Sequence, residues 1–193
     1  MVTPQPPEGG VMMEKLSTHI NDLVTEAEAK NYVWQILADV LDPEVPVLSV
    51  LDLGIVRDVK THIIAPGNFA VEVVVTPTYT GCPAIDVINM HIRMALLQHG
   101  FKDITLIQVL SPAWTTDWIT EAGKEKLKAY GIAPPHPRQQ VCTPDLFQEE
   151  EAIPCPLCNS HNTRLVSQFG STACKALYQC NDCQEPFDYF KCH

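Results

Sequence analysis

The fold is decided by the stretch Thr76-Pro-Thr-Tyr-Thr-Gly-Cys-Pro83, which joins two segments of different apolar periodicity. The alternating apolar run at 69–75 leads into it and predicts a strand, whereas the spacing of apolar residues at 84–98 predicts an amphipathic helix. Gly81 permits a tight or left-handed backbone, and Pro83 suits the first helical position because an N–H is unpaired there in any case. The sequence therefore predicts a strand-to-helix turn.

Cys82 falls at the expected N-cap of this helix, where unpaired backbone N–H groups would face its sulfur. A thiol in that position ionises more easily than a free one, which indicates a nucleophile or a metal ligand. Asp86 in the first helical turn opposes thiolate formation through its negative charge. The competing interpretation is a small buried thiol, since free cysteine is often buried. Spacing alone favours neither.

Length and charge limit the class of protein. A chain of 193 residues accommodates one ordinary domain and a small one. A net charge of −10 weighs against nucleic-acid binding, which depends on basic side chains that neutralise phosphates. No apolar run approaches the ~20 residues of a membrane span, and the Pro/Gly-rich start does not resemble a secretory signal. We therefore expect a cytoplasmic protein that is not embedded in a membrane.

The remaining periodicities predict an α+β domain at residues 26–130, after a flexible N-terminal extension at 1–25. Its small mixed sheet would be covered by helices, in the order helix, two strands, helix, strand, helix. The expected elements are a helix at 27–41, a hairpin of 55–64 and 69–75, the helix at 84–98, a strand at 103–110, and a last helix through Ala129, capped by Thr115 or Thr116. Residues 131–153 lack an amphipathic period and are expected to form a linker.

A small zinc ribbon is predicted for residues 154–193. Its ligands would be two Cys-x-x-Cys pairs, Cys155 with Cys158 and Cys180 with Cys183, separated by 21 residues. Two such pairs complete a tetrahedron of thiolates around Zn²⁺. The segments 163–169 and 176–179 are expected to be its strands. So small a module buries little core, so the metal would supply much of its folding energy. A single iron ion or a labile cluster is the alternative occupant.

The other cysteines and the aromatic residues near the C-terminus leave alternatives open. Cys174 is either a packed thiol or an additional metal ligand. Cys192 is either part of a solvated chain end or an additional metal ligand, and Cys142 receives no role. The aromatic run at 187–190 is either a docking surface or the core of the ribbon. Trp114 and Trp118 are expected in the core or at an interface.

Three carboxylates precede the hairpin, namely Asp42, Glu44 and Asp52. They are candidates for an acid/base pair, but aspartate beside proline or glycine more often stabilises a turn, and we favour the turn. The sequence contains no Gly-rich phosphate loop and no His-Glu-x-x-His or Gly-x-Ser-x-Gly motif. A self-contained enzyme is therefore not visible in it.

Several of these motifs together resemble known families. Asp42-Pro-Glu44, Asp52-Leu-Gly54 and the Thr76–Pro83 stretch are similar to the small domain of iron–sulfur cluster assembly factors of the SUF-T type and of cytosolic targeting factors. Over residues 27–193 the chain resembles the PaaD family of bacterial phenylacetate degradation, through Ser111-Pro-Ala-Trp-Thr-Thr-Asp-Trp118, Tyr130-Gly-Ile-Ala-Pro-Pro135, Phe169-Gly-Ser-Thr-Ala-Cys-Lys-Ala-Leu-Tyr178 and Glu185-Pro-Phe-Asp-Tyr-Phe-Lys-Cys192. In the wider family the residue matching Cys82 is the functional thiol. We expect the turn residues Asp42, Glu44, Asp52, Thr76 and Thr80 to support it.

The resemblance implies an accessory protein of the phenylacetyl-CoA ring 1,2-epoxidase that matures its iron–sulfur or di-iron centre. Its cofactors would be structural zinc and a transient iron–sulfur cluster or iron. Its partners would be the oxygenase component, the iron–sulfur reductase component, or both, and a homodimer stays open. The alternatives are a structural subunit that bridges those two components, a nucleic-acid-binding zinc ribbon, and dithiol redox chemistry at a Cys-x-x-Cys pair.

Overall fold

The computed structural model describes residues 20–79, 81–135 and 153–191. A short 3₁₀ helix, η1 (Ile20–Asp22), leads into helix α1 (Glu26–Ala38). Ile20 and Leu23 are buried, so the end of the expected extension packs into the domain. Thr25 begins α1 with a capping box: its hydroxyl accepts from the Glu28 N–H (3.2 Å), and the Glu28 carboxylate accepts from the Thr25 N–H (2.9 Å).

Helix α1 is shorter than expected, because it ends at Ala38 instead of Leu41. The next residues leave the helix to pair with the segment that follows the turn. Val50 donates to the carbonyl of Val40 (2.9 Å) and Asp42 donates to that of Leu48 (2.8 Å). This pairing turns Leu41 outward, and its side chain is 46% exposed. The expectation that Leu41 extends the buried face of α1 was therefore wrong.

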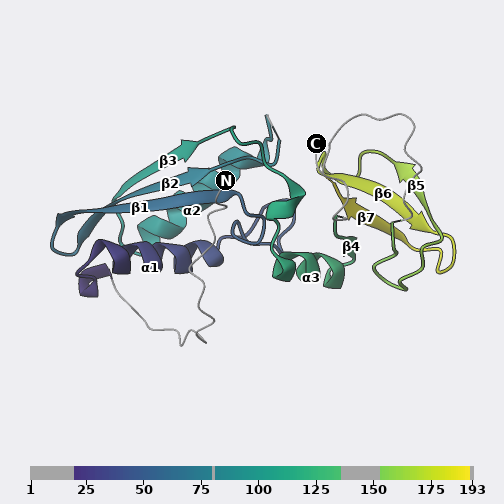
Figure 1. Cartoon of the computed structure of the whole chain (residues 1–193), viewed down its shortest axis with the longest axis horizontal. Coiled ribbons are helices and arrows are strands. Elements are labelled where there is room, and N and C mark those ends of the chain that lie inside the picture. Colours follow the sequence, from purple (N-terminus) through teal and green to yellow (C-terminus); the bar gives the residue numbers. More distant parts are fainter. Residues whose placement is uncertain (1–19, 80, 136–152, 192–193) are drawn as a thin grey trace.

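The central sheet has three strands and is mixed (Figure 1). Strands β1 (Val56–Ala65) and β2 (Asn68–Val75) form the antiparallel hairpin. Helix α2 (Ala84–Gln98) then crosses over to β3 (Asp103–Gln108), which lies parallel to β2. Alternate residues of β2 are buried, and α2 buries the face that its periodicity predicted. The predicted hairpin, helix and strand order are confirmed.

The last helical segment is divided into two pieces: a 3₁₀ helix, η2 (Thr116–Trp118), precedes α3 (Glu121–Ala129). Ile119 between them is extended, so one continuous helix capped by Thr115 or Thr116 was the wrong expectation. Thr120 is the cap of α3 and accepts from the Gly123 N–H (3.0 Å). Its own N–H donates to the carbonyl of Asp52 (2.9 Å), which fixes the start of α3 against the central domain.

The C-terminal sheet has four strands in the order β4-β7-β6-β5. They are β4 (Ile132–Ala133), β5 (Thr163–Ser167), β6 (Lys175–Cys180) and β7 (Pro186–Phe190). Strand β4 lies in the segment expected to be a linker and pairs in parallel with β7. The proposed division of the chain into domains stays a prediction, but the ribbon sheet includes residues from this segment.

The aromatic residues of β7 are core residues and not an exposed docking surface, since Phe187, Tyr189 and Phe190 are all buried. Phe190 packs edge-to-face on Trp114, with ring centroids 6.3 Å apart. Trp114 in turn donates its indole N–H to the carbonyl of Leu53 (2.8 Å). These contacts connect the ribbon to the central domain. Within the described ranges, no helix has the length and apolar character needed to cross a bilayer.

Candidate functional site

Cys82 lies on the turn between β2 and α2, as the sequence predicted. Gly81 has a φ of +82°, in the left-handed region that favours glycine. The helix begins one residue later than expected, because Pro83 and not Cys82 is the N-cap, and no side chain caps it. The Cys82 N–H donates to the carbonyl of Tyr79 (3.2 Å), and its own carbonyl accepts from the Ile85 N–H (3.3 Å). The side chain of Cys82 is 8% exposed.

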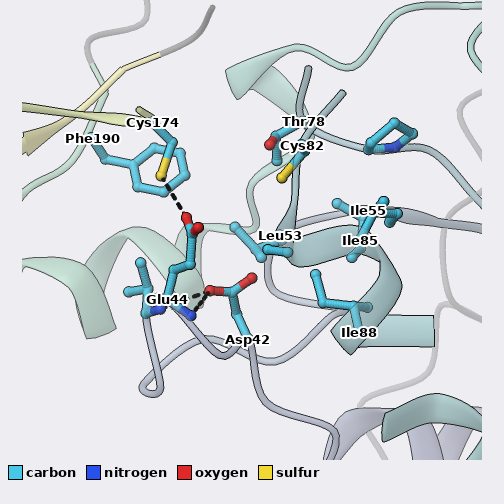
Figure 2. A pocket seen from close by; sticks show the side chains of 13 residues that line it. Asp42, Glu44, Leu53, Ile55, Thr78, Cys82, Ile85, Ile88, Cys174 and Phe190 are labelled. Atoms are coloured by element: carbon cyan, nitrogen blue, oxygen red, sulfur yellow. Dashed lines mark hydrogen bonds between the residues drawn. The ribbon is translucent and has the colours of Figure 1, made fainter. Parts of the chain in front are cut away.

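A pocket brings Cys82 together with residues from the ribbon (Figure 2). Its empty volume is about 380 Å³, which includes the solvent at its mouth. The polar side chains on its wall are Asp42, Glu44, Thr78, Cys82 and Cys174. Aliphatic residues and Phe190 complete the lining. The site is therefore a largely apolar recess that carries two thiols and two carboxylates, contributed by both parts of the chain.

Asp42 stabilises the turn at the base of this pocket. Its Oδ1 accepts from the backbone N–H groups of Glu44 (2.8 Å) and Val45 (2.7 Å). Burial raises the pKa of Asp42, and the nearby negative charge of Glu44 adds to this, while the two backbone hydrogen bonds oppose it. Asp42 therefore performs the turn chemistry that we favoured over acid/base catalysis.

Glu44 links this turn to the ribbon. Its Oε2 accepts a hydrogen bond from the thiol of Cys174, at a donor–acceptor distance of 3.5 Å. The Thr172 hydroxyl lies 3.1 Å from the same sulfur. Burial and then the carboxylate of Glu44 raise the pKa of Cys174 to about 11, against the opposing hydrogen bond of Thr172. Cys174 is therefore a protonated, buried thiol at neutral pH.

Tyr79 belongs to the same electrostatic environment. Burial, followed by the proximity of Cys82, raises the pKa of Tyr79 to about 12, with smaller contributions from Glu44 and Cys174. Its phenol therefore stays neutral at physiological pH, close to both thiols.

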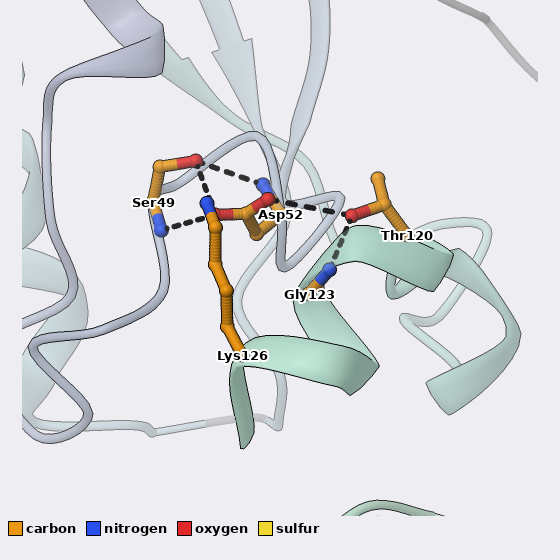
Figure 3. A network of polar contacts seen from close by, with 5 residues as sticks. All are labelled: Ser49, Asp52, Thr120, Gly123 and Lys126. Atoms are coloured by element: carbon orange, nitrogen blue, oxygen red, sulfur yellow. Dashed lines mark hydrogen bonds and ion pairs between the residues drawn. The ribbon is translucent and has the colours of Figure 1, made fainter. Parts of the chain in front are cut away.

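Asp52 lies in a separate polar network (Figure 3). Its Oδ2 accepts from the N–H of Ser49 (2.9 Å), the hydroxyl of Ser49 (2.9 Å) and the ammonium of Lys126 (2.6 Å). Burial raises the pKa of Asp52, but the hydrogen bonds from Lys126 and Ser49 outweigh it and hold the pKa below its usual value. Asp52 does not line the pocket around Cys82. It connects the turn that begins at Ser49 to α3, which is a structural role.

The other residues expected to support Cys82 are less informative. Thr76 is 1% exposed, and its N–H donates to the carbonyl of Ile55 (2.8 Å). Among the described residues, no hydrogen-bond partner faces its hydroxyl. Thr80 and the additional candidate ligand Cys192 lie outside the described residues, as does Cys142.

The four predicted ribbon cysteines converge on one point. The sulfur atoms of Cys155, Cys158, Cys180 and Cys183 all lie within 4.8 Å of one another. Across the pairs, Cys155 lies 3.8 Å from Cys183, and Cys158 lies 3.6 Å from Cys180. Four sulfur donors at this spacing fit a tetrahedral metal ion, as zinc in structural sites requires.

The two Cys-x-x-Cys turns repeat the same backbone pattern. The N–H of Cys155 donates to the carbonyl of Ser160, and that of Cys180 donates to the carbonyl of Glu185. In each turn, the residue after the second cysteine has a positive φ, 59° at Asn159 and 64° at Gln184. The Cys183 N–H points to the sulfur of Cys180 (3.5 Å), and this backbone donor leads the contributions that lower the pKa of Cys180 to about 7. The two turns therefore share one hydrogen-bonded backbone geometry, and together they bring four sulfur atoms to one point.

Sequence reasoning missed two partners of the site. Phe190 lines the pocket from β7, and Lys126 binds Asp52 from α3. Phe190 lies in the aromatic run at 187–190, but that run does not predict a contact with the Cys82 pocket, and Lys126 belongs to no motif. Each contact depends on how distant elements pack. Thr78, in contrast, belongs to the same turn motif as Cys82 and was available to sequence reasoning.

Two family models match separate parts of the chain. Residues 30–103 match the family described as iron–sulfur cluster assembly protein, and residues 139–191 match the PaaD zinc β-ribbon domain. The chain is 47% identical over 160 residues to an Escherichia coli protein described as one subunit of a "putative 1,2-phenylacetyl-CoA epoxidase", covering 83% of this chain and 91% of that one.

Two further comparisons each cover about half of the chain. The chain is 34% identical over 90 residues to the "Fe-S protein maturation auxiliary factor" of Porphyromonas gingivalis, covering 46% of this chain and 81% of that one. A crystal structure of a domain of unknown function, DUF59, from Bacillus anthracis aligns with a TM-score of 0.47 at 24% identity, covering 53% of this chain and 93% of that one.

Proposed function

Because the chain belongs to the PaaD family, we propose that it is an accessory protein of the phenylacetyl-CoA ring 1,2-epoxidase in phenylacetate catabolism. In this proposal it holds iron or an iron–sulfur cluster on Cys82 and transfers it to an oxygenase or reductase component. The match of residues 30–103 to iron–sulfur assembly proteins and the description of the Escherichia coli relative both support this role.

The observation that carries the proposal is the position of Cys82. The thiol lines a pocket in which carboxylates and a second thiol also lie, and thiolates are the protein ligands that iron–sulfur clusters use. Apart from its chain neighbours, no atom of the described residues lies within 4 Å of the position that a Cβ on the preceding Gly81 would take. The turn is therefore not locked by packing on that side, which suits a thiol that must accept and release cargo.

The ribbon serves this function as a folded docking module. We propose that Zn²⁺ occupies its four-cysteine site, because the sulfur donors and their closed arrangement suit a structural zinc ion. The exposed side chains of Leu157, Val166 and Phe169 offer apolar surface for a client. One iron ion in the same site stays the alternative, and metal analysis distinguishes the two.

The test is the metal and sulfide content of anaerobically purified protein, in wild type and Cys82→Ser. We expect about one zinc per chain in both proteins, with iron and sulfide only in the wild type. Cys142→Ser is a control for the loss of one thiol and should match the wild type. Zinc without iron in every protein, even after reconstitution, would contradict cargo binding at Cys82.

A second candidate function is that of a structural subunit that bridges the oxygenase and reductase components. The description of the Escherichia coli relative as a subunit favours it. Co-purification separates the two functions. A maturation factor with Cys82→Ser leaves the epoxidase without its metal centre, whereas a scaffold with the same substitution still assembles an active complex.

A further inference from the structure

Cys174 belongs to the ribbon in sequence but to the central domain in packing. It precedes β6, yet its side chain lies in the larger apolar core together with Cys82, Ile85 and Leu53. The core of the ribbon is a separate cluster around Phe187, Tyr189 and two of the ribbon cysteines, Cys155 and Cys180. Cys174 is 6% exposed and lines the same pocket as Cys82. The ribbon therefore contributes a buried thiol to the Cys82 pocket.

The residues beside Cys174 hold it in this position. The Lys191 N–H donates to its carbonyl (3.0 Å), which ties it to the end of β7. Its sulfur donates to Glu44 from the other part of the chain. Figure 2 shows Cys82 and Cys174 entering the pocket from opposite sides, with the carboxylate of Glu44 directed at Cys174. Two thiols and one carboxylate, none of them among the four ribbon ligands, thus share one recess.

These three groups do not yet form a coordination shell. In the described part of the chain, the ribbon cysteines are the one group of three or more donors whose atoms all lie within 4.8 Å. An ion bound in the pocket would therefore have to draw Cys82 and Cys174 together. The pocket between them leaves room for this movement, and Cys82 lies on a turn rather than inside a helix.

We propose that Cys174 is the second thiol ligand of the iron cargo held by Cys82, with Glu44 as a carboxylate ligand. The cargo site is then formed by both domains. This inference rests on the proposed function, since it names further ligands of the same cargo. The chemistry required of the cargo is iron that accepts thiolate ligands, either as a free ferrous ion or as an iron of a cluster.

The binding step balances without an oxidant. Ferrous iron replaces the thiol protons of Cys82 and Cys174, and both protons leave to solvent. The iron stays in the ferrous oxidation state. In the free protein, the carboxylate of Glu44 accepts a hydrogen bond from Cys174. On binding, this hydrogen bond is lost and the carboxylate binds the metal instead. For a cluster, the same two thiolates replace weaker ligands on its iron, and no electrons are transferred.

The first test is anaerobic titration of zinc-loaded full-length protein with ferrous ion, and with Co²⁺ as a spectroscopic substitute. In the wild type, the thiolate-to-metal charge-transfer absorption should correspond to roughly two thiolate ligands per added ion. In Cys82→Ser and in Cys174→Ser, it should correspond to roughly one thiolate ligand per ion. Cys174→Ser should weaken binding at least about tenfold, since even the loss of groups that only support metal ligands costs that much. Glu44→Gln tests the carboxylate, and Cys142→Ser is the matched control.

The second test needs no substitution. Wild type is alkylated with and without ferrous ion or a reconstituted cluster, and the labelling of each cysteine is read by mass spectrometry. We expect the cargo to protect Cys82 and Cys174 together, with acid-labile sulfide separating a cluster from an ion. Protection of Cys82 alone would overturn this inference and leave the proposed function intact. Protection of neither thiol would contradict both.

Discussion

Asp42 and Asp52 are both buried carboxylates, but their surroundings move their pKa values in opposite directions. Burial, with the like charge of Glu44, raises the pKa of Asp42, and it outweighs the two backbone hydrogen bonds and the more distant charge of Lys175. Asp52 meets the ammonium of Lys126, which together with Ser49 outweighs burial and lowers its pKa. The two residues therefore contribute to stability in different ranges of pH.

For Asp42, removing the charge should be tolerated and removing the acceptor should not. Asp42→Asn keeps an oxygen for the N–H groups of Glu44 and Val45, whereas Asp42→Ala leaves both donors without it. We expect Asp42→Ala to lower the free energy of unfolding by about 2 kcal/mol at pH 7 and Asp42→Asn by clearly less.

The pH dependence follows from the raised pKa of Asp42. Its contribution is complete below the pKa of an unfolded aspartate and is lost as pH rises through the higher folded value. Urea unfolding at pH 4 and pH 7 measures the effect. The free energy of unfolding of Asp42→Asn, relative to that of the wild type, should be higher at pH 7 than at pH 4. A greater loss for Asn than for Ala would contradict the turn role.

For Asp52, the lowered pKa reverses the sign. Its contribution is present above the unfolded pKa of about 3.9 and is lost as pH falls through the folded value. We expect Asp52→Asn to lower the free energy of unfolding by about 1–2 kcal/mol at pH 7, with the difference narrowing below about pH 4. The matched control is Glu72→Gln, which breaks the exposed pair with Lys60 and should cost less than about 1 kcal/mol. If Asp52→Asn and Glu72→Gln lowered the free energy of unfolding equally, burial of the Asp52 pair would not strengthen its contribution to stability.

At the scale of elements, two glycines with positive φ make different demands on their turns. Gly54 (φ +65°) follows Asp52, and a Cβ there would lie 2.3 Å from the carbonyl oxygen of Trp118. Gly81 (φ +82°) precedes Cys82, and a Cβ there would meet no atom of the described residues within 4 Å, its chain neighbours aside. Gly54 is therefore required by both conformation and close packing, and Gly81 by conformation alone.

Alanine substitutions should separate these two requirements. We expect Gly81→Ala to lower the free energy of unfolding by about 1–2 kcal/mol, which is the cost of a left-handed residue with a Cβ. Gly54→Ala should cost at least about 3 kcal/mol, because overlap with the backbone of Trp118 adds to that strain. Thermal and urea unfolding of both variants provide the measurement. A Gly54→Ala protein as stable as Gly81→Ala would show that the Gly54 turn shifts away from Trp118.

At the scale of the whole molecule, the ribbon and the central domain depend on each other. The ribbon brings its four cysteines to one point, and its Phe190 and Cys174 complete the larger core. The same two residues form one wall of the Cys82 pocket. The state of the metal site should therefore affect the accessibility of the thiol pocket, although the two sites share no ligand.

Removal of zinc by a chelator is the test at this scale. We expect the loss of metal to unfold the ribbon strands, since so small a module depends on the metal for stability. Cys174 should then react with an alkylating reagent much faster than in the zinc-loaded protein, while helix signal from α1 and α2 persists. Re-addition of Zn²⁺ should restore protection. An unchanged rate at Cys174 after complete removal of zinc would contradict the coupling.

The sequence by itself determined the order of the elements around the Cys82 turn and the four cysteines that converge in the ribbon. The alternation at 69–75, the helical period at 84–98 and the turn residues between them act over neighbouring positions, so they are visible without the fold. The two Cys-x-x-Cys pairs are local in the same sense, because each pair must bind the metal from a single turn. The α+β domain and the four-cysteine ribbon were therefore predicted correctly.

Only the tertiary structure decided how those parts meet. The end of α1 at Ala38 depends on pairing between 40–42 and 48–50, and the break before α3 depends on the bond from Thr120 to Asp52. The contact of Cys174 with Glu44 joins residues 130 positions apart. Such contacts depend on the packing of whole elements against one another, and no local pattern in the sequence records that packing.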